Sequence, residues 1–485
     1  MRLAWLAFAL TVGPAAAAID VTAAWRGWAN AGVSELELRV PASARGGQVE
    51  ISLQSAAQQI VSSAAARAGV PTVLRLPTPT AAPLRLAARN PDGVAHLGQF
   101  EFQQSERPIV IWANGLVWAG GAVEQAAADV NLLAMGAADL PRLPQSYSSI
   151  SGIVIDDTML KALDDLQMSA LLQHIRACGF TIALNLNAAA AALQRSAGCG
   201  GRQLIILDGA VAPAEAVRLF MNRDSAAGPS ANALGALAPA DPRLNWLLVA
   251  LLAYGVCAAA TLLLLGRSRW LLALPPLATG ALALALYLRE PQQTIVVWAE
   301  GRSGDRQAQF TGRLRLQGTT PARAAIALPA LIEHAEPCEA VASTRAHWDA
   351  VGQHTTHTDV DLRLLSTRNF CFAGSFPVSY AARAQQQDAN TLQFSNSGAA
   401  GWVDARLLWQ GRTYRAAALA PQGVLRIDLR EGMSAETAAE RLAAARLRWG
   451  QAGLLVPLQL TLLAANARQA LGWLFVSIPV TQVPQ

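Results

Sequence analysis

The chain has 485 residues, a formal net charge of +5, 53% hydrophobic residues and only 15% charged residues. This length exceeds one typical domain, so two or three domains are expected, and the apolar excess should be concentrated in particular segments. Almost all of the cations are arginines, with Lys161 the only lysine. Because they are scattered rather than clustered with aromatic residues, nucleic acid is excluded as a predicted partner.

Residues 1–18 have the three parts of a secretory signal peptide. Arg2 is followed by an apolar run from Leu3 to Val12 and then by small residues that end at Ala18. The apolar run is too short to cross a bilayer as a helix. We therefore predict cleavage before Ile19 and an extracytoplasmic location for the region that begins there; an uncleaved N-terminal anchor is the alternative.

Residues 19–106 are predicted to form a β-sandwich. Charged and apolar residues alternate in Glu35–Val40, Thr72–Leu76 and Leu84–Ala87. This period of two, between turns rich in proline, glycine, asparagine and aspartate, is typical of half-buried strands. Several such strands in a segment of this size indicate a small β-sandwich.

Residues 107–224 show a different pattern, in which short apolar strands alternate with helices. The predicted strands are Pro108–Ala113, Ile150–Asp157, Phe180–Leu184 and Gln203–Leu207. Apolar strands that alternate with helices favour a doubly wound parallel α/β domain. A linker is predicted at 225–243, directly after this domain.

The run from Tyr147 to Leu184 resembles the class I glutamine-amidotransferase-like domain of uncharacterised bacterial membrane proteins. In true amidotransferases a nucleophilic cysteine sits on a glycine-flanked turn between a strand and a helix. The matching point here, Leu184–Ala189, contains neither cysteine nor glycine, and Cys178 and Cys199 both precede strands. The resemblance therefore implies a degenerate, non-catalytic version of the domain that binds a partner.

Asp156 and Asp157 lie at the carboxyl end of a predicted strand, which is where α/β sheets place their binding sites. Two adjacent carboxylates predict a weak acidic site that could hold a divalent cation. The alternative interpretation is that one of them caps the next helix, because aspartate accepts hydrogen bonds from the first backbone N–H groups of a helix.

Two long charge-free stretches lie near the middle of the chain, at 244–265 and 270–288. Each is long enough to cross a membrane as a helix, and four residues, 266–269, separate them. Arg267 and Arg269 place this turn in the cytoplasm by the positive-inside rule. The pattern predicts a two-helix transmembrane hairpin with both large regions outside; a buried helical hairpin of a soluble protein is the alternative.

Residues 289–485 are predicted to form an outer β-rich domain with one late helix at Ala435–Trp449, capped by Ser434. A hairpin is expected around the turn Gln410–Gly411. The region also holds a group of histidines, which are weak metal-ligand candidates because imidazole binds transition metals. These are His334, His347, His354 and His357.

Five cysteines are present, and an oxidising compartment would allow four of them to pair. One disulfide in each outer region, Cys178 with Cys199 and Cys338 with Cys371, leaves Cys257 in the first apolar stretch. Each would stabilise the fold by about 3–4 kcal/mol. Four reduced, buried cysteines are the alternative.

Together these patterns predict a multidomain fold of α/β plus all-β type in a bacterial inner-membrane protein with both large domains in the periplasm. The predicted function is that of a non-enzymatic scaffold or assembly component, with other envelope proteins and membrane lipid as partners and without a cofactor. The alternative is an extracytoplasmic hydrolase or metal-binding enzyme that uses Asp156 or the His334–His357 group.

Overall fold

The computed structural model describes most of the chain from Ile19 onward. The predicted signal peptide, the segment 114–128 and nearly all of 239–291 lie outside the described residues. The described ranges are 19–56, 58–113, 129–184, 190–198, 203–208, 213–222, 229, 231–238, 255–256, 292–318, 321–327, 332–338, 344–349, 354–363, 366–378, 380–458 and 469–482.

A three-stranded antiparallel sheet opens the fold. Its strands are β1 (Asp20–Ala23), β3 (Val33–Val40) and β6 (Thr72–Pro79), in the order β1-β3-β6. The alternating leucines of β3 and β6, among them Leu36, Leu38 and Leu76, point inward and are fully buried. A short 3-10 turn, η2 (Ala24–Gly27), leads to β2 (Trp28–Ala29), which pairs with β9 (Gln103–Gln104).

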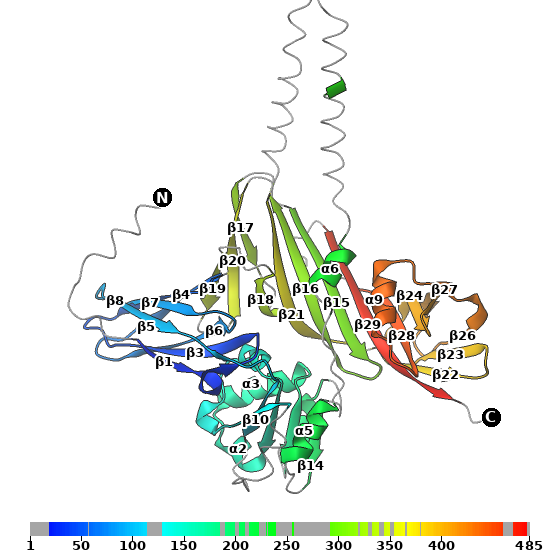
Figure 1. Cartoon of the computed structure of the whole chain (residues 1–485), viewed down its shortest axis with the longest axis horizontal. Helices are drawn as coiled ribbons and strands as arrows, with labels where there is room; N and C mark the ends of the chain where they lie inside the picture. The colour runs from blue at the N-terminus through cyan, green and yellow to red at the C-terminus, as the bar shows by residue number, and fades with distance from the viewer. Residues whose placement is uncertain are drawn as a thin grey trace, which may run out of the picture.

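A seven-stranded sheet packs against it, and we call this the shared sheet because both halves of the chain supply its strands. Four strands come from the N-terminal half and three from the C-terminal half, and Figure 1 shows them side by side. The join is the parallel pairing of β5 with β19, from Gln58 opposite Thr344 to Ser62 opposite Trp348. In sheet order the strands are β17 (Ala322–Ala327), β20 (His354–Leu362), β19 (Thr344–Asp349), β5 (Gln58–Ala66), β4 (Gly47–Gln54), β7 (Leu84–Arg89) and β8 (Ala95–Phe100).

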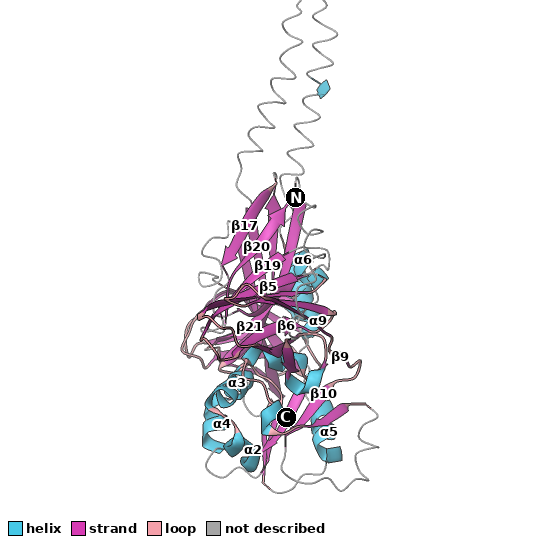
Figure 2. Ribbon diagram, turned by 90° about the vertical axis from the view of Figure 1, so that its left-hand side faces the viewer, coloured by secondary structure: helices cyan, strands magenta, loops and turns pink. Residues whose placement is uncertain are grey.

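Five short parallel strands form a third sheet, with helices packed on both faces (Figure 2). Its order is β11 (Asn131–Ala134), β10 (Ile109–Ala113), β12 (Gly152–Asp156), β13 (Thr181–Leu184) and β14 (Leu204–Leu207). The helices α2 (Asp157–Ala162), α3 (Asp165–Arg176) and α4 (Ala190–Ser196) share an apolar core with one face, and α5 (Pro213–Met221) with the other. The 3-10 turns η3 (Ala137–Asp139) and η4 (Pro144–Ser149) lie between β11 and β12.

The largest sheet has twelve strands and contains most of the C-terminal half. Its main path is β18 (Ile332–Pro337), β21 (Ser366–Pro377), β16 (Gln307–Gly318), β15 (Gln292–Arg302), β29 (Gln469–Gln482), β28 (Gln451–Pro457), β24 (Trp402–Trp409), β25 (Arg412–Leu419) and β27 (Met433–Ser434), with β22 (Ala382–Gln386), β23 (Thr391–Asn396) and β26 (Val424–Asp428) as a branch. The remaining elements are α6 (Ala231–Leu237), η7 (Leu429–Glu431) and α9 (Ala438–Arg446); α6 and α9 pack on one face of this sheet.

The predicted fold class is wrong. The described chain is mostly β, and the N-terminal strands do not close into a sandwich of their own, because β17, β19 and β20 complete their sheet. Among its described residues, the segment predicted as a doubly wound domain holds five short strands, and most of the other described strand pairs are antiparallel. The predicted transmembrane hairpin is not shown either: of its residues, only Gly255 and Val256 are described, and no described helix is long and apolar enough to cross a membrane.

Candidate functional site

The outer face of the shared sheet carries a row of aligned side chains that crosses all seven strands, and six of the seven are polar. Residues that lie directly opposite each other on paired strands project from the same face of a sheet. The row therefore runs from one half of the chain into the other without interruption. In sheet order it consists of Gln99, Arg85, Gln54, Gln59, Arg345, Asp359 and Ala325.

Side-chain hydrogen bonds join the two halves along this row. Arg345 Nε donates to Gln59 Oε1 over 3.2 Å, across the β5–β19 join. Within the N-terminal half, Gln59 Nε2 donates in turn to Ser52 Oγ over 2.7 Å. On the inner face, Ser62 Oγ donates to the carbonyl of Trp348 over 3.0 Å. The join is therefore held by side chains on both faces as well as by the backbone ladder.

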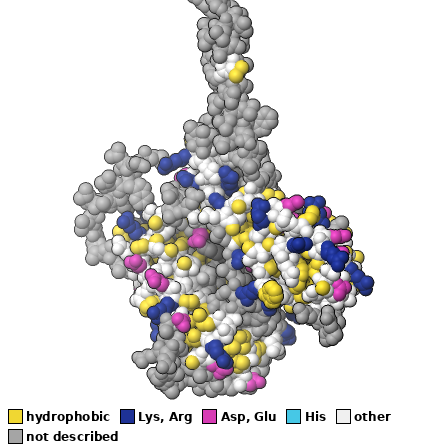
Figure 3. Space-filling model, turned by 45° about the vertical axis from the view of Figure 1, so that its right-hand side comes forward, with side chains coloured by type: hydrophobic (Ala, Val, Ile, Leu, Met, Phe, Trp, Pro, Cys, Tyr) yellow, Lys and Arg dark blue, Asp and Glu magenta, His cyan; other side chains and the backbone are white. Residues whose placement is uncertain are grey.

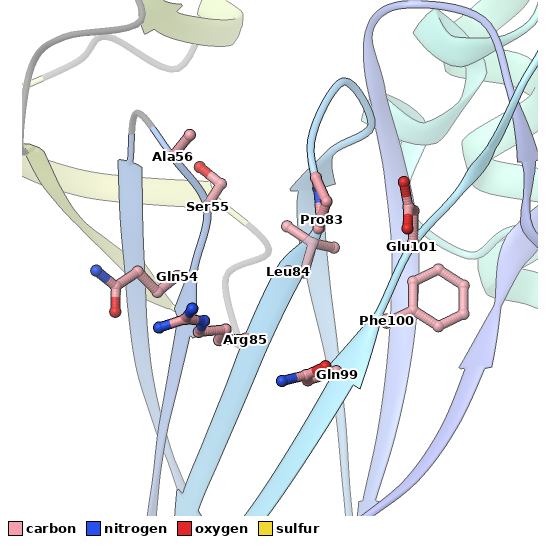
Figure 4. A pocket seen from close by; sticks show the side chains of 9 residues that line it. All are labelled: Gln54, Ser55, Ala56, Pro83, Leu84, Arg85, Gln99, Phe100 and Glu101. Atoms are coloured by element: carbon pink, nitrogen blue, oxygen red, sulfur yellow. The ribbon is translucent and has the colours of Figure 1, made fainter.

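A groove of about 620 Å³ opens at the end of this row, where β4, β7 and β8 meet the neighbouring loops (Figure 4). Leu84 and Phe100 supply apolar surface, while Arg85 and Glu101 supply one charge of each sign. The remaining lining residues are Gln54, Ser55, Ala56, Pro83 and Gln99. A groove with an apolar part and mixed polar groups suits a peptide better than a single small ion.

The predicted acidic site has a structural role in its described surroundings. Asp156 ends β12 and is the N-cap of α2, where its Oδ1 accepts a hydrogen bond of 2.7 Å from the backbone N–H of Met159. Asp157 lies in the first helical turn, 2.5 Å from Nζ of Lys161. The capping alternative is therefore confirmed for Asp156, and Asp157 forms an ion pair along the helix.

The predicted histidine group is divided between two sheets. His334 lies on β18 of the twelve-stranded sheet, whereas the other three lie on β19 and β20 of the shared sheet. The register places His347 opposite His357, and His354 opposite Asp349. Nε2 of His347 lies 3.3 Å from Oδ2 of Asp359. Within the described residues, no three His, Cys, Asp or Glu side chains form a group that could hold a metal ion.

The predicted disulfide between Cys338 and Cys371 is confirmed, and it joins the end of β18 to β21. Cys178 is also disulfide-bonded, and its predicted partner Cys199 lies outside the described residues. Cys178 has a φ of 64° in the turn that ends α3. The backbone N–H of Cys178 donates to the carbonyl of Ile175, and the N–H of Gly179 donates to the carbonyl of His174. These two bonds form a Schellman motif, in which a cysteine takes the position where glycine is usual.

Sequence reasoning missed a buried carboxylate between the N-terminal strands and the parallel sheet. Glu35 is only 4% exposed, and its Oε2 accepts 2.7 Å hydrogen bonds from the backbone N–H groups of Arg142 and Leu143. Desolvation by burial raises the pKa of Glu35, and the bonds from Leu143 and Arg142 and the nearby Arg75 only partly offset this effect. The alternation in β3 predicted an outward side chain, so no sequence signal identified it.

A half-buried histidine lies nearby. His174 of α3 stacks on Tyr147 with ring centroids 4.6 Å apart, and Trp25 packs edge-on against the same tyrosine. Burial lowers the pKa of His174 to about 4, so the imidazole is neutral at pH 7. It also raises the pKa of Tyr147. Tyr147 is buried and His174 is half-buried, and their rings pack against each other, so we assign them a packing role.

The parallel sheet also contacts the twelve-stranded sheet directly. The carbonyl of Gly198, just after α4, accepts hydrogen bonds from the backbone N–H groups of Arg306 and Gln307, and Gln309 Nε2 donates to the carbonyl of Ala177 over 2.6 Å. A cavity of about 510 Å³ lies at this contact. The β15–β16 turn therefore fixes the parallel sheet relative to the long strands.

Charges on the face displayed in Figure 3 are interspersed rather than separated by sign. Basic and acidic side chains are mixed over the right-hand part of this view. Among the C-terminal elements, Arg406 pairs with Glu440 at 3.3 Å and Arg415 with Glu436 at 3.8 Å. Such a surface lacks the single-sign stripe that tracks a nucleic-acid backbone.

Comparison with known proteins gives no family assignment. No family model matches the chain, and no curated protein matches it. Two solved structures of the yeast delta-COP-I mu-homology domain, one in complex with a Dsl1 WxWxV peptide, are similar at 9% identity, covering 40% of this chain and 97% of that domain. Their TM-scores are 0.21 and 0.20, a likeness too low to carry an argument about fold or function. The resemblance to amidotransferase-like domains stays a prediction.

Proposed function

We propose that the chain is a non-enzymatic scaffold of the bacterial envelope, anchored in the inner membrane with its folded part in the periplasm. The observation that carries this proposal is the shared sheet. Because strands from both halves pair in it, surfaces encoded far apart in the sequence are held in a fixed relation. Fixed presentation of several surfaces is what an assembly platform requires.

The residues with potential chemistry favour this function over the enzymatic alternative. Asp156 caps a helix, Asp157 pairs with Lys161 and His347 pairs with Asp359. A catalytic carboxylate or base needs a free approach to a substrate proton or a metal. The groove at β4, β7 and β8, with its mixture of apolar and polar lining residues, instead suits a segment of a partner protein.

Two further observations support the proposed location. The Cys338–Cys371 disulfide and the bonded Cys178 suit an oxidising compartment such as the periplasm. The charge-free stretches 244–265 and 270–288 suit an anchor in the membrane. The described elements on either side of them, α6 and β15, pack together in one apolar cluster that contains Leu237 and Val296.

Site-specific photo-cross-linking in native membranes tests the proposal. A photoreactive amino acid is placed at Gln54 or Ala56 in the groove, and at Val424 on β26 as a control far from it. Discrete adducts with envelope proteins at the groove positions, but not at Val424, are expected. The proposal fails if neither groove position yields an adduct and the purified chain carries stoichiometric metal or a hydrolytic activity that Asp156→Asn abolishes.

A further inference from the structure

The edge strand β8 differs from the other edge strands among the described residues. Natural sheets protect their edges with charged residues, prolines or very short strands, because unpaired backbone groups invite pairing with another chain. Six-residue β8, Ala95–Phe100, has none of these protections. Each of the other described edge strands has at least one of these protections. Charged residues or prolines occur on five of them: Arg323 on β17, Glu336 and Pro337 on β18, Arg426 and Asp428 on β26, Arg75, Pro77 and Pro79 on β6, and Asp20 on β1. The others, β2, β9, β11, β14 and β27, are only two to four residues long.

Side chains on and beside β8 add to this exposed edge. Leu97 projects from the outer face with 67% of its surface exposed, and Val94, just before the strand, is 46% exposed. At Gly98 an added Cβ would lie no closer than 3.6 Å to any atom, so internal packing does not require a glycine there. A glycine in a strand often marks the close approach of another backbone.

We propose that β8 pairs with β8 of a second copy of this chain, antiparallel about a two-fold axis at Leu97, so that the two shared sheets become continuous. This inference names one partner surface of the proposed scaffold and therefore rests on that function. The composition of the strand favours this occupant, because β8 has no Asp, Glu, Lys or Arg that would face the same charge in a second copy, so the strand is self-complementary.

This register accounts for the exposed apolar residues. With the axis at Leu97, the two Leu97 side chains lie opposite each other and Ala95 lies opposite Gln99 of the second copy. Val94 reaches the level of Phe100 of the second copy, which lines the groove at the end of β8. Both exposed apolar residues are then withdrawn from water, which is the main driving force for association.

Cysteine cross-linking of the full chain in membranes tests the register. Leu97→Cys is compared with Val70→Cys, which replaces a valine of similar exposure, 51%, in the turn before β6. With mild oxidant, Leu97→Cys is expected to give a reductant-sensitive product of twice the chain mass, and Val70→Cys only the level of the unmodified chain. Equal cross-linking of the two variants would overturn the register.

A charge-swap experiment tests the pairing itself. Leu97→Lys places like charges opposite each other and should raise the dimer dissociation constant, measured by light scattering in detergent, about tenfold or more. Mixing Leu97→Lys with Leu97→Glu should restore the dimer. A monomeric unmodified chain, or a Leu97→Lys chain that dimerises as well as the unmodified one, would overturn the inference. Adducts between the groove and other envelope proteins would still support the scaffold in that case, so the two proposals fail separately.

Discussion

The indole N–H of Trp348 donates to the backbone carbonyl of Arg75 over 3.1 Å, although the two residues lie in opposite halves of the chain. Trp348 belongs to β19, and its side chain, 5% exposed, lies in the apolar core formed by the N-terminal strands. The C-terminal half therefore contributes to the interior of the N-terminal half as well as to its sheet.

Truncation of this tryptophan should separate the halves. Trp348→Ala removes a buried aromatic side chain and is expected to lower the free energy of unfolding by about 3–5 kcal/mol. Trp348→Phe keeps most of the apolar volume and loses the bond to Arg75, so its cost should be clearly smaller. Urea denaturation measures both values, and limited proteolysis should release an N-terminal fragment only from Trp348→Ala. Equal effects of the two variants would contradict this account.

Glu35 should be needed as a hydrogen-bond acceptor rather than as a charge. Glu35→Ala leaves two buried backbone N–H groups without their acceptor and should cost about 2–5 kcal/mol of stability. Glu35→Gln keeps a carbonyl oxygen at that position and should cost much less. Thermal and urea unfolding of both variants measure the difference.

The effect of Glu35→Gln on stability should also depend on pH. Burial holds the pKa of Glu35 above its usual value, so its protonated form is favoured in the folded state and the stability it contributes is lost as pH rises through the folded pKa. Glu35→Gln does not lose this contribution. Its cost relative to the unmodified chain should therefore be smaller at pH 7 than at pH 4, and a cost that grows with pH would contradict the prediction.

Protonation of His174 in acid should lower the stability of the fold. Its folded pKa, lowered to about 4 by burial, lies below the ordinary value near 6.5 in the unfolded chain. The contribution of the neutral ring is therefore complete above about pH 6.5 and is lost toward pH 4, at roughly 1.4 kcal/mol per pH unit. His174→Phe keeps an aromatic ring against Tyr147 and should flatten the stability curve in this window. Parallel curves for the two proteins would rule this out.

Asp156 should behave as a helix cap. Asparagine caps a helix about as well as aspartate does, so Asp156→Asn should cost at most half as much stability as Asp156→Ala, which is expected to lose about 1 kcal/mol. Calorimetry of both variants provides the test. Equal losses would indicate that the carboxylate charge, rather than the cap at Met159, is what the fold requires.

Features encoded by neighbouring residues were predictable from the sequence. The β24–β25 hairpin turns at Gln410 and Gly411, whose φ values of 48° and 77° are those of a type I′ turn. The late helix, α9, lies within the predicted range, although Thr437 rather than Ser434 is its cap, because Glu440 completes a capping box with Thr437. The Cys338–Cys371 pair was predictable from the even number of cysteines within one region.

Features that join distant segments were not predictable. The alternating pattern of β5 indicates a strand but does not indicate which strand lies beside it. The sequence around Trp348 is equally consistent with a separate C-terminal domain. Likewise, the position of Glu35 in an alternating strand indicated exposure, whereas in the structure it is buried and bonded to the loop at Arg142 and Leu143. The candidate surface lies on this shared sheet, so it could not be predicted either.

The shared sheet also sets the order in which the protein can be built. During synthesis β4 and β5 leave the ribosome long before β19, so the edge of β5 stays open until residue 349 has been made. Contacts this distant in sequence form slowly, and an open strand edge is prone to aggregation during the delay. Folding of the N-terminal half is therefore complete only after the C-terminal half has been synthesised. A nascent chain that ends before β19 would expose the unpaired edge of β5, which is prone to aggregation.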